Sequence, residues 1–224
     1  KHFIKNTVFV RQTGFDFTHV VRKKSNIYGY LTNQYFASEK SAESCTYLIV
    51  GDSYVEASQI QNEDTFHAIL SKNLVCDIYP IGASGDPLSQ YLANAKFAKK
   101  EFQPDLYIFT VISNDFDESW LRYKSAASAH YFDDKENLTR IDFQPSKIGL
   151  ILRQSAFFRY LMIDLKINNQ LRNIFSKQAK ETKIKKTKTN DFERLSYMLK
   201  ASEIFVRELR KVVEGKKVVL VFDG

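Results

Sequence analysis

The sequence predicts an α/β fold in which helices cover both faces of a mostly parallel sheet, giving three layers. Two observations predict it. Nearly continuous apolar runs, which are typical of strands buried on both faces, occupy residues 47–50, 75–79, 106–112 and 217–222. Segments with the apolar spacing of helices lie between these runs, and alternating strands and helices indicate a parallel sheet with right-handed crossovers.

The first part of the chain has a different pattern. Residues 1–43 alternate aromatic, β-branched and polar side chains, as in TVFV at 7–10, which predicts short strands or extended chain with a turn near 26–29. No catalytic pattern stands out in this part. We therefore expect an N-terminal extension packed on a core domain that spans residues 44–224.

The core domain should begin with the strand at 47–50, which ends at Gly51. The second strand should be closed by Pro80, and the helix after it should have Asp86 as its N-cap and Pro87 at its first position, a common helix start. The remaining expected elements are a helix over 64–74, a helix over 87–102, a strand over 106–112, a helix over about 190–214 and a strand over 217–222.

Residues 116–190 form a longer stretch than one crossover helix requires. They include Trp120, Phe132 and a strongly apolar segment with helical spacing over 151–175. We interpret the stretch as an insertion above the sheet. It is either a lid or acyl-binding wall, or an extra helix packed on the core, since apolar helical stripes usually serve packing.

The net charge of +7, from 33 Lys and Arg against 26 Asp and Glu, is partly local. Residues 177–188 (KQAKETKIKKTK) form a lysine-rich run almost without aromatic residues, whereas nucleic-acid surfaces usually combine cations with stacking rings. We interpret this run as a solvated loop or helix end and expect no nucleic-acid partner.

Two cysteines, Cys45 and Cys76, lie beside or within predicted strands. They form neither a disulfide framework nor a metal cluster, so they are either buried thiols or one disulfide between neighbouring strands.

No apolar stretch is long enough to span a bilayer, and no signal peptide is visible. Because the chain begins with Lys1 and stops just after a strand, we expect both ends to be cut. The expected compartment is the bacterial periplasm or cell envelope if a membrane anchor lies outside this sequence, and the cytoplasm otherwise. The sequence does not indicate the oligomeric state.

Polar residues follow each of the first three core strands, where an open parallel sheet binds its ligands. The segments are GDS at 51–53, GASGD at 82–86 and SND at 113–115. Ser53 is a candidate nucleophile, which needs a base. The backbone N–H of Gly85 and the side-chain amide of Asn114 are candidate donors to an oxyanion. Taken singly, each segment is equally explained as a turn or a helix cap.

In this order and position, the three segments resemble the sequence blocks of the SGNH (GDSL-like) serine hydrolase superfamily. The resemblance covers residues 46–116 closely and the remaining chain only by general fold. It implies the flavodoxin-like SGNH hydrolase fold and esterase or lipase-like hydrolysis through an acyl-enzyme on Ser53. It also implies oxyanion donors at Ser53, Gly85 and Asn114, no cofactor or metal, and a small-molecule or carbohydrate ester as substrate.

Two departures from the family pattern stand out. Ile112 occupies the position where the family usually has glycine, and no Asp-x-x-His block follows Asn114. The segment DFTH at 16–19 has that spacing but precedes the serine, so a catalytic role for His19 is not favoured. The other histidines are His2, His67 and His130. We therefore expect the C-terminal part of the fold to be missing, and this chain alone to be nearly inert.

Three alternatives remain beside ester hydrolysis. The acyl group could pass to a sugar hydroxyl. The superfamily is similar to domains that acetylate or deacetylate cell-envelope polysaccharides. The chain could also be a non-catalytic binding module that kept the fold and lost the histidine. Flavodoxin-like cofactor binding is the least favoured, because no phosphate-binding loop follows the first strand.

Overall fold

A computed structural model describes residues 3–13, 18–32, 45–142 and 191–223. Residues 1–141 together with 194–224 form one compact unit, and 142–193 form a second. The apolar segment 151–175 and the lysine run 177–188 lie outside the described residues, as do the lid and acyl-wall interpretations that depend on them. The expected boundary between an extension and a core domain near residue 44 stays a prediction.

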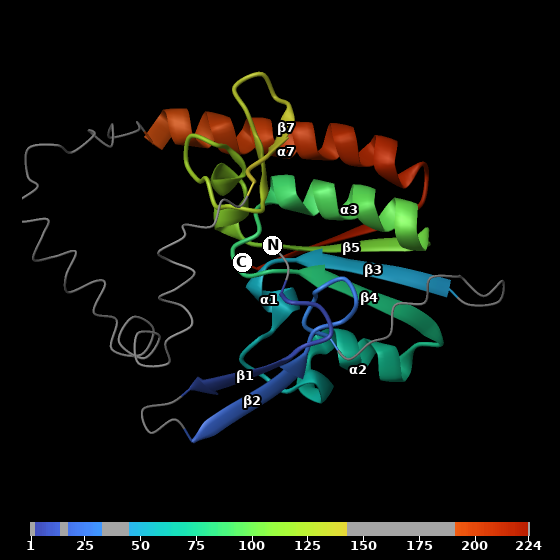
Figure 1. Cartoon of the computed structure of the whole chain (residues 1–224). Helices are drawn as coiled ribbons and strands as arrows, with labels where there is room; N and C mark the ends of the chain where they lie inside the picture. Colours follow the sequence, from blue (N-terminus) through green and yellow to red (C-terminus); the bar gives the residue numbers. More distant parts are fainter. Residues whose placement is uncertain (1–2, 14–17, 33–44, 143–190, 224) are drawn as a thin grey trace, which may run out of the picture. The chain divides into compact units, whose positions relative to one another are not determined.

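The first unit is a mixed α/β fold around a four-stranded parallel sheet (Figure 1), which confirms the predicted fold class in its coarser form. Each of the four predicted strands is present. In the spatial order β4-β3-β5-β8 they span Cys76–Gly82, Cys45–Gly51, Leu106–Val111 and Lys217–Phe222.

The prediction that the second strand ends at Pro80 is wrong. Strand β4 continues through Pro80 to Gly82, and Pro80 is paired in register with Ile49 of β3. The sheet tolerates proline here because β4 is an edge strand among the described strands, and a proline on an edge can direct its missing N–H away from the neighbouring strand.

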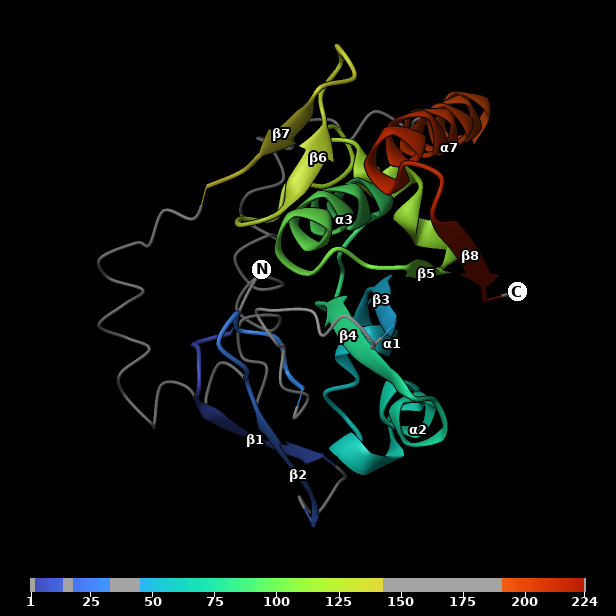
Figure 2. The ribbon, with the colours of Figure 1, turned by 90° about the vertical axis from the view of Figure 1, so that its right-hand side faces the viewer.

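Helices lie on both faces of this sheet (Figure 2). Successive residues of β3 point to opposite sides, as a strand requires: Leu48 and Val50 join one apolar cluster, and Ile49 joins another. The first cluster includes residues of α3 and α7, and the second includes Val55 of α1 and Phe66 of α2. The helices α1, α2, α3 and α7 span Ser53–Glu56, Phe66–Asn73, Leu88–Phe102 and Asp191–Val213.

The expected start of the second long helix needs a correction. Helix α3 begins at Leu88, its N-cap is Pro87, and no side chain caps it. Asp86, the expected cap, lies in the loop that follows β4 and is buried at 2% exposure. The fixed φ of proline suits the step from extended loop to helix, and the Asp86 carboxylate does not cap α3.

The described part of the expected insertion packs on the core. Trp120 and Phe132 are each 1% exposed and belong to the larger apolar cluster. The Trp120 indole N–H donates to the carbonyl of Tyr197 on α7 at 2.8 Å. A short antiparallel pair, β6 (His130–Phe132) and β7 (Leu138–Arg140), and the two 3₁₀ turns η2 (Ser113–Asp115) and η3 (Asp117–Ser119) complete this region.

Near the N-terminus, β1 (Val8–Thr13) and β2 (His19–Lys24) form an antiparallel hairpin, so of the two expected alternatives, short strands or extended chain, these residues form strands. The hairpin contacts the segment after α1: the Arg11 guanidinium donates to the Ser58 hydroxyl at 2.6 Å, and the Gln61 amide donates to the Val20 carbonyl at 3.1 Å. The expected turn is present, since the Gly29 N–H donates to the Asn26 carbonyl.

Cys45 and Cys76 occupy paired positions of β3 and β4 and are joined by a disulfide, with Cα atoms 4.7 Å apart. Of the two cysteine alternatives, the structure therefore contains the disulfide between neighbouring strands. No described helix has the length and apolar character that crossing a membrane requires.

Candidate functional site

Two glycines at the carboxyl ends of β3 and β4 bring the loops after them into close contact. Gly51 and Gly82 are paired in register. A Cβ atom on Gly82 would lie 2.5 Å from the Gly51 carbonyl oxygen, and one on Gly51 would lie 2.0 Å from the Thr110 hydroxyl of β5. Because side chains cannot fit at these positions, the loops that carry Ser53 and Gly85 leave the sheet side by side.

Ser53 is the first residue of α1 and is exposed. Its hydroxyl donates to one carboxylate oxygen of Asp52 at 3.0 Å, and the other oxygen of Asp52 accepts the Tyr54 N–H, also at 3.0 Å. Asp52 itself is only 3% exposed. A buried carboxylate therefore caps the helix and orients the serine, as expected for an acidic N-cap.

A pocket of about 450 Å³ opens in front of Ser53. Besides Ser53 it is lined by Ser84 from the loop after β4 and by five residues of and after α1: Tyr54, Ala57, Ser58, Gln59 and Ile60. Gly85 and Asn114 do not line this pocket. The serine and the second loop thus share one cavity, whose wall is mostly polar or aromatic.

The loop after β4 is held from both ends. The backbone N–H of Ser84 donates to the Glu56 carboxylate at 2.5 Å, and the N–H of Asp86 donates to the Ala83 carbonyl at 2.9 Å. Between them, Gly85 has φ +74°, a left-handed conformation that favours glycine. Its carbonyl accepts a hydrogen bond from the Lys124 ammonium at 2.8 Å.

Asn114 lies in the 3₁₀ turn η2 directly after β5 and is half-buried. The adjacent Asp115, 1% exposed, anchors this turn: its carboxylate accepts the Ile112 N–H at 2.9 Å and the Tyr91 hydroxyl at 2.8 Å. Burial raises the pKa of Asp115 to about 7, and burial likewise raises the pKa of Tyr91. The turn is thereby fixed to α3 as well as to the residue that follows β5.

The three predicted oxyanion donors share one property. Within the described residues, the backbone N–H groups of Ser53 and Gly85 and the side-chain amide of Asn114 have no hydrogen-bond acceptor. All three residues are at least partly open to solvent, so these groups can donate to water or to a ligand. A site for a developing negative charge requires donors aimed at one point, and the convergence of these three stays a prediction.

None of the described histidines is hydrogen-bonded to Ser53. Nε2 of His19 lies 3.2 Å from the Gln59 carbonyl, which can only accept, so this nitrogen carries the hydrogen. Nδ1 of His130 is likewise a donor, because it lies 3.0 Å from the Gln90 side-chain oxygen that also accepts the His130 backbone N–H. Asp16, the other end of the DFTH segment, lies outside the described residues.

His67 is buried on α2, with Nδ1 3.2 Å from the Thr65 hydroxyl. Burial, and then the charge of Lys23, lower the pKa of His67 to about 4. Burial and then the charge of Arg140 also lower the pKa of His130. Both pKa shifts favour the neutral imidazole.

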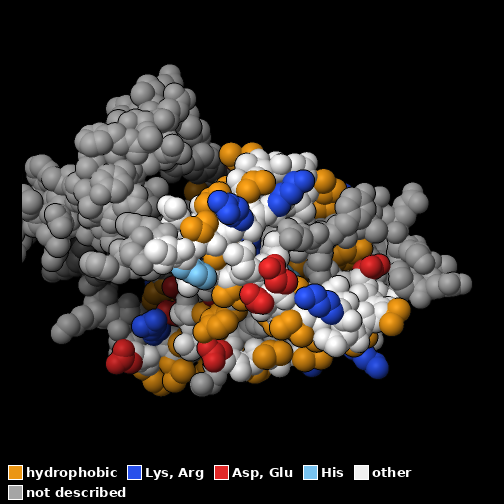
Figure 3. All heavy atoms as spheres, turned by 90° about the horizontal axis from the view of Figure 1, so that it is seen from below, with side chains coloured by type: hydrophobic (Ala, Val, Ile, Leu, Met, Phe, Trp, Pro, Cys, Tyr) orange, Lys and Arg blue, Asp and Glu red, His pale blue; other side chains and the backbone are white. Residues whose placement is uncertain are grey.

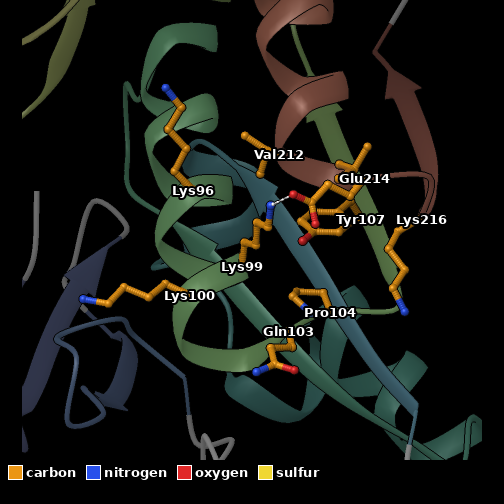
Figure 4. A pocket seen from close by; sticks show the side chains of 10 residues that line it. Lys96, Lys99, Lys100, Gln103, Pro104, Tyr107, Val212, Glu214 and Lys216 are labelled. Atoms are coloured by element: carbon orange, nitrogen blue, oxygen red, sulfur yellow. Dashed lines mark ion pairs between the residues drawn. The ribbon is translucent and has the colours of Figure 1, made fainter.

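A lysine-lined cavity and the described acidic side chains do not point to a ligand. A cavity of about 560 Å³ lies at the amino-terminal edge of β5 and β8 and has several lysines in its wall (Figure 4). Its Lys99 is paired with Glu214 at 2.6 Å, and Lys216 is paired with Asp105 at 3.0 Å. No described cluster of His, Cys, Asp or Glu is arranged to hold a metal ion. Acidic, basic and hydrophobic side chains are interspersed on the face drawn in Figure 3.

Sequence reasoning missed three residues that shape these loops: Glu56, Asp115 and Lys124. Asp115 could have been found, because an acidic side chain three positions after the N-cap can accept the N-cap N–H, as in a capping box. Glu56 and Lys124 carry no such signal, since their contacts join positions 28 and 39 residues apart.

Among known proteins, the chain shows a structural likeness. No protein-family model matches the chain, and no curated protein matches it. Among solved structures, one similar protein is AlinE4, an SGNH-hydrolase family esterase, with 25% identity over 38% of this chain and a TM-score of 0.30. The chain spans 47%, or about half, of the length of AlinE4. At this TM-score the likeness shows neither family nor activity, so both must be inferred from the chain's own residues.

Proposed function

We propose that the full-length protein is a serine ester hydrolase of SGNH type, with the three-layer α/β/α fold of that superfamily and Ser53 as its nucleophile. One observation carries the proposal. Three donors without a described acceptor, on Ser53, Gly85 and Asn114, follow three neighbouring parallel strands, and the exposed hydroxyl of Ser53 faces a pocket of about 450 Å³. The substrate class is a small-molecule or carbohydrate ester.

The reaction follows from the chemistry of these groups. The Ser53 oxygen attacks the ester carbonyl carbon while a general base takes its proton. The carbonyl oxygen becomes an oxyanion, to which the two backbone N–H groups and the Asn114 amide donate. The bond to the alcohol oxygen then breaks, and the alcohol leaves with the proton. Water releases the acyl group as a carboxylate and restores Ser53.

A second candidate function is supported by the histidines. None of those described is bonded to Ser53, whose hydroxyl donates to Asp52 instead. A serine without a base is a poor nucleophile. A non-catalytic module that binds a carboxylate or an ester group at the same three donors is therefore the alternative.

Covalent labelling separates the two functions. The full-length gene product is treated with a fluorophosphonate probe, and the modified peptide is identified by mass spectrometry. An esterase gives modification at Ser53, which Ser53→Ala abolishes. The matched control is Ser125→Ala, which changes an exposed serine that does not line the pocket and should leave labelling intact.

Asn114→Ala tests the oxyanion role. Loss of one such donor typically lowers kcat by about 100- to 1000-fold, so hydrolysis of a p-nitrophenyl ester should fall by that factor while KM changes little. Asn73→Ala, on the exposed face of α2, is the control. An unmodified Ser53 in a folded, full-length protein would exclude the esterase and favour the binding module.

A further inference from the structure

Helix α1 begins with the proposed nucleophile and ends with a side chain bound to the next loop. Glu56, the last residue of α1, is 7% exposed, and its carboxylate accepts the Ser84 N–H at 2.5 Å. Ser84 immediately precedes Gly85. Hydrogen bonds to a charged acceptor are shorter and stronger than neutral ones. The four residues of α1 thus connect Ser53 to the loop that supplies a proposed oxyanion donor.

This bond also selects which N–H of the loop is available. The Ser84 N–H donates to Glu56 and the Asp86 N–H donates to Ala83. Gly85 lies between them, and its N–H has no acceptor in the described part of the chain. With Glu56 in place, Gly85 is the residue among 84–86 whose N–H is left as a donor.

A buried lysine from the N-terminal hairpin supports Glu56. Lys23 of β2 is 3% exposed, and its ammonium donates to the Glu56 backbone carbonyl at 3.3 Å. Burial lowers the pKa of Lys23 to about 8, although the nearby charge of Glu56 opposes this change. A buried ammonium is costly compared with an apolar side chain of similar size. A lysine here therefore calls for a role other than packing.

We propose that Glu56 is a positioning residue for the oxyanion site: it holds the Ser84 N–H so that Gly85 is left as the donor, and Lys23 holds Glu56. The inference rests on the proposed function of Ser53. It gives the hairpin β1–β2, which carries no catalytic pattern of its own, a part in arranging the site.

The test uses the full-length protein with ¹⁵N-labelled serine and glycine, because amide exchange at Ser84 reports the bond whether or not the enzyme is active. Glu56→Ala should speed exchange of the Ser84 amide by at least tenfold and shift the Gly85 signal. Glu56→Gln, which retains an acceptor oxygen, should preserve most of the protection. Glu63→Ala, an exposed carboxylate on the 3₁₀ turn η1 (Asn62–Asp64), is the matched control.

Kinetics supply the second readout. With a p-nitrophenyl ester, Glu56→Ala should lower kcat about 10- to 100-fold with little change in KM, within the range for loss or misplacement of one donor. Glu56→Gln should recover most of this loss. Equal loss of kcat in both variants, or unchanged Ser84 exchange in Glu56→Ala, would overturn the positioning role. If the wild type is inactive but Ser84 exchange responds as expected, the proposed esterase function fails, and the positioning of Ser84 by Glu56 stands.

Lys23→Met tests the support of Glu56. It keeps most of the stem but removes the donor to the Glu56 carbonyl, so the unfolding free energy should fall. If Lys23 positions Glu56, Ser84 exchange should become faster by more than this global loss allows, and kcat of the folded variant should fall about 3- to 10-fold. The control is Lys24→Met, its exposed neighbour on β2. Unchanged exchange and kcat in Lys23→Met would remove Lys23 from the proposal.

Discussion

Replacing Tyr91 with Phe should destabilise the protein more at pH 8 than at pH 5. Tyr91 is fully buried, and its hydroxyl donates to the Asp115 carboxylate at 2.8 Å. Because burial raises the pKa of Asp115 to about 7, this carboxyl group is mostly charged at pH 8 and mostly neutral at pH 5. The Phe ring fills nearly the same space, so the substitution removes one hydrogen bond and changes little else.

The magnitude follows from the charge of the acceptor. A hydrogen bond to a charged group contributes about 1.5–3 kcal/mol to stability, and one between neutral groups about 0.5–1.5 kcal/mol. Tyr91→Phe should therefore cost about 2 kcal/mol at pH 8 and about 1 kcal/mol at pH 5.

The wild type itself should lose stability as the pH rises through this range. The pKa of Asp115 in the folded protein lies above its ordinary value of 3.8, so the folded state binds this proton more tightly than the unfolded state. The resulting stabilisation is complete below about pH 4 and is lost by about pH 7. At about 1.4 kcal/mol per pKa unit, the loss is on the order of 4 kcal/mol. It should be larger in Tyr91→Phe, because the Tyr91 hydroxyl lowers the pKa of Asp115.

Urea unfolding of both proteins at pH 5 and pH 8 measures these differences. Tyr107→Phe is the control, because Tyr107 is equally buried but its hydroxyl has no hydrogen-bond partner among the described residues, so its effect should not depend on pH. If Tyr91→Phe lowers the unfolding free energy equally at both pH values, or more at pH 5, then Asp115 is not a charged acceptor for the Tyr91 hydroxyl at pH 8.

Three further predictions concern other parts of the fold. Reduction, or Cys45→Ser with Cys76→Ser, should lower the unfolding free energy by about 3.5 kcal/mol in urea titrations, because the disulfide joins positions 31 residues apart; insensitivity to reductant would mean that the bond does not form. Gly82→Ala should cost about 1–3 kcal/mol by thermal unfolding, since its Cβ would meet the Gly51 carbonyl oxygen at 2.5 Å; a neutral result would contradict the close approach of the two loops. His19→Gln keeps an N–H donor for the Gln59 carbonyl, so fluorophosphonate labelling of Ser53 should persist; its loss would make His19 the base.

The parallel sheet could be predicted because each strand is a nearly continuous apolar run, and such runs need cover on both faces. The ends of the strands are harder to predict from the sequence. A proline is a strong local signal to stop a strand, yet β4 passes through Pro80 because that strand lies at the edge of the described sheet. Edge position is a property of the assembled sheet, and a local pattern does not contain it.

The candidate site likewise contains residues that the sequence indicates and residues that it does not. Ser53, Gly85 and Asn114 could be singled out because each directly follows a strand that is visible in the sequence. The groups that hold their loops could not, because the contacts join distant positions: Lys23 and Glu56 are 33 residues apart, and Gly85 and Lys124 are 39 residues apart. The disulfide stayed open for a similar reason, since pairing Cys45 with Cys76 requires the register of two strands.

The bonds of His19 assign the N-terminal hairpin a supporting role. A nitrogen that carries a hydrogen cannot accept one, so Nε2 of His19 could serve Ser53 only after the ring changes tautomer and gives up the Gln59 carbonyl. Gln59 belongs to the wall of the Ser53 pocket, so breaking that bond would also release the wall from the hairpin. Arg11 and Lys23 make similar bonds, to Ser58 and to Glu56. Because all three hairpin side chains bind the segment that surrounds the serine, we expect the hairpin to fix the shape of the pocket.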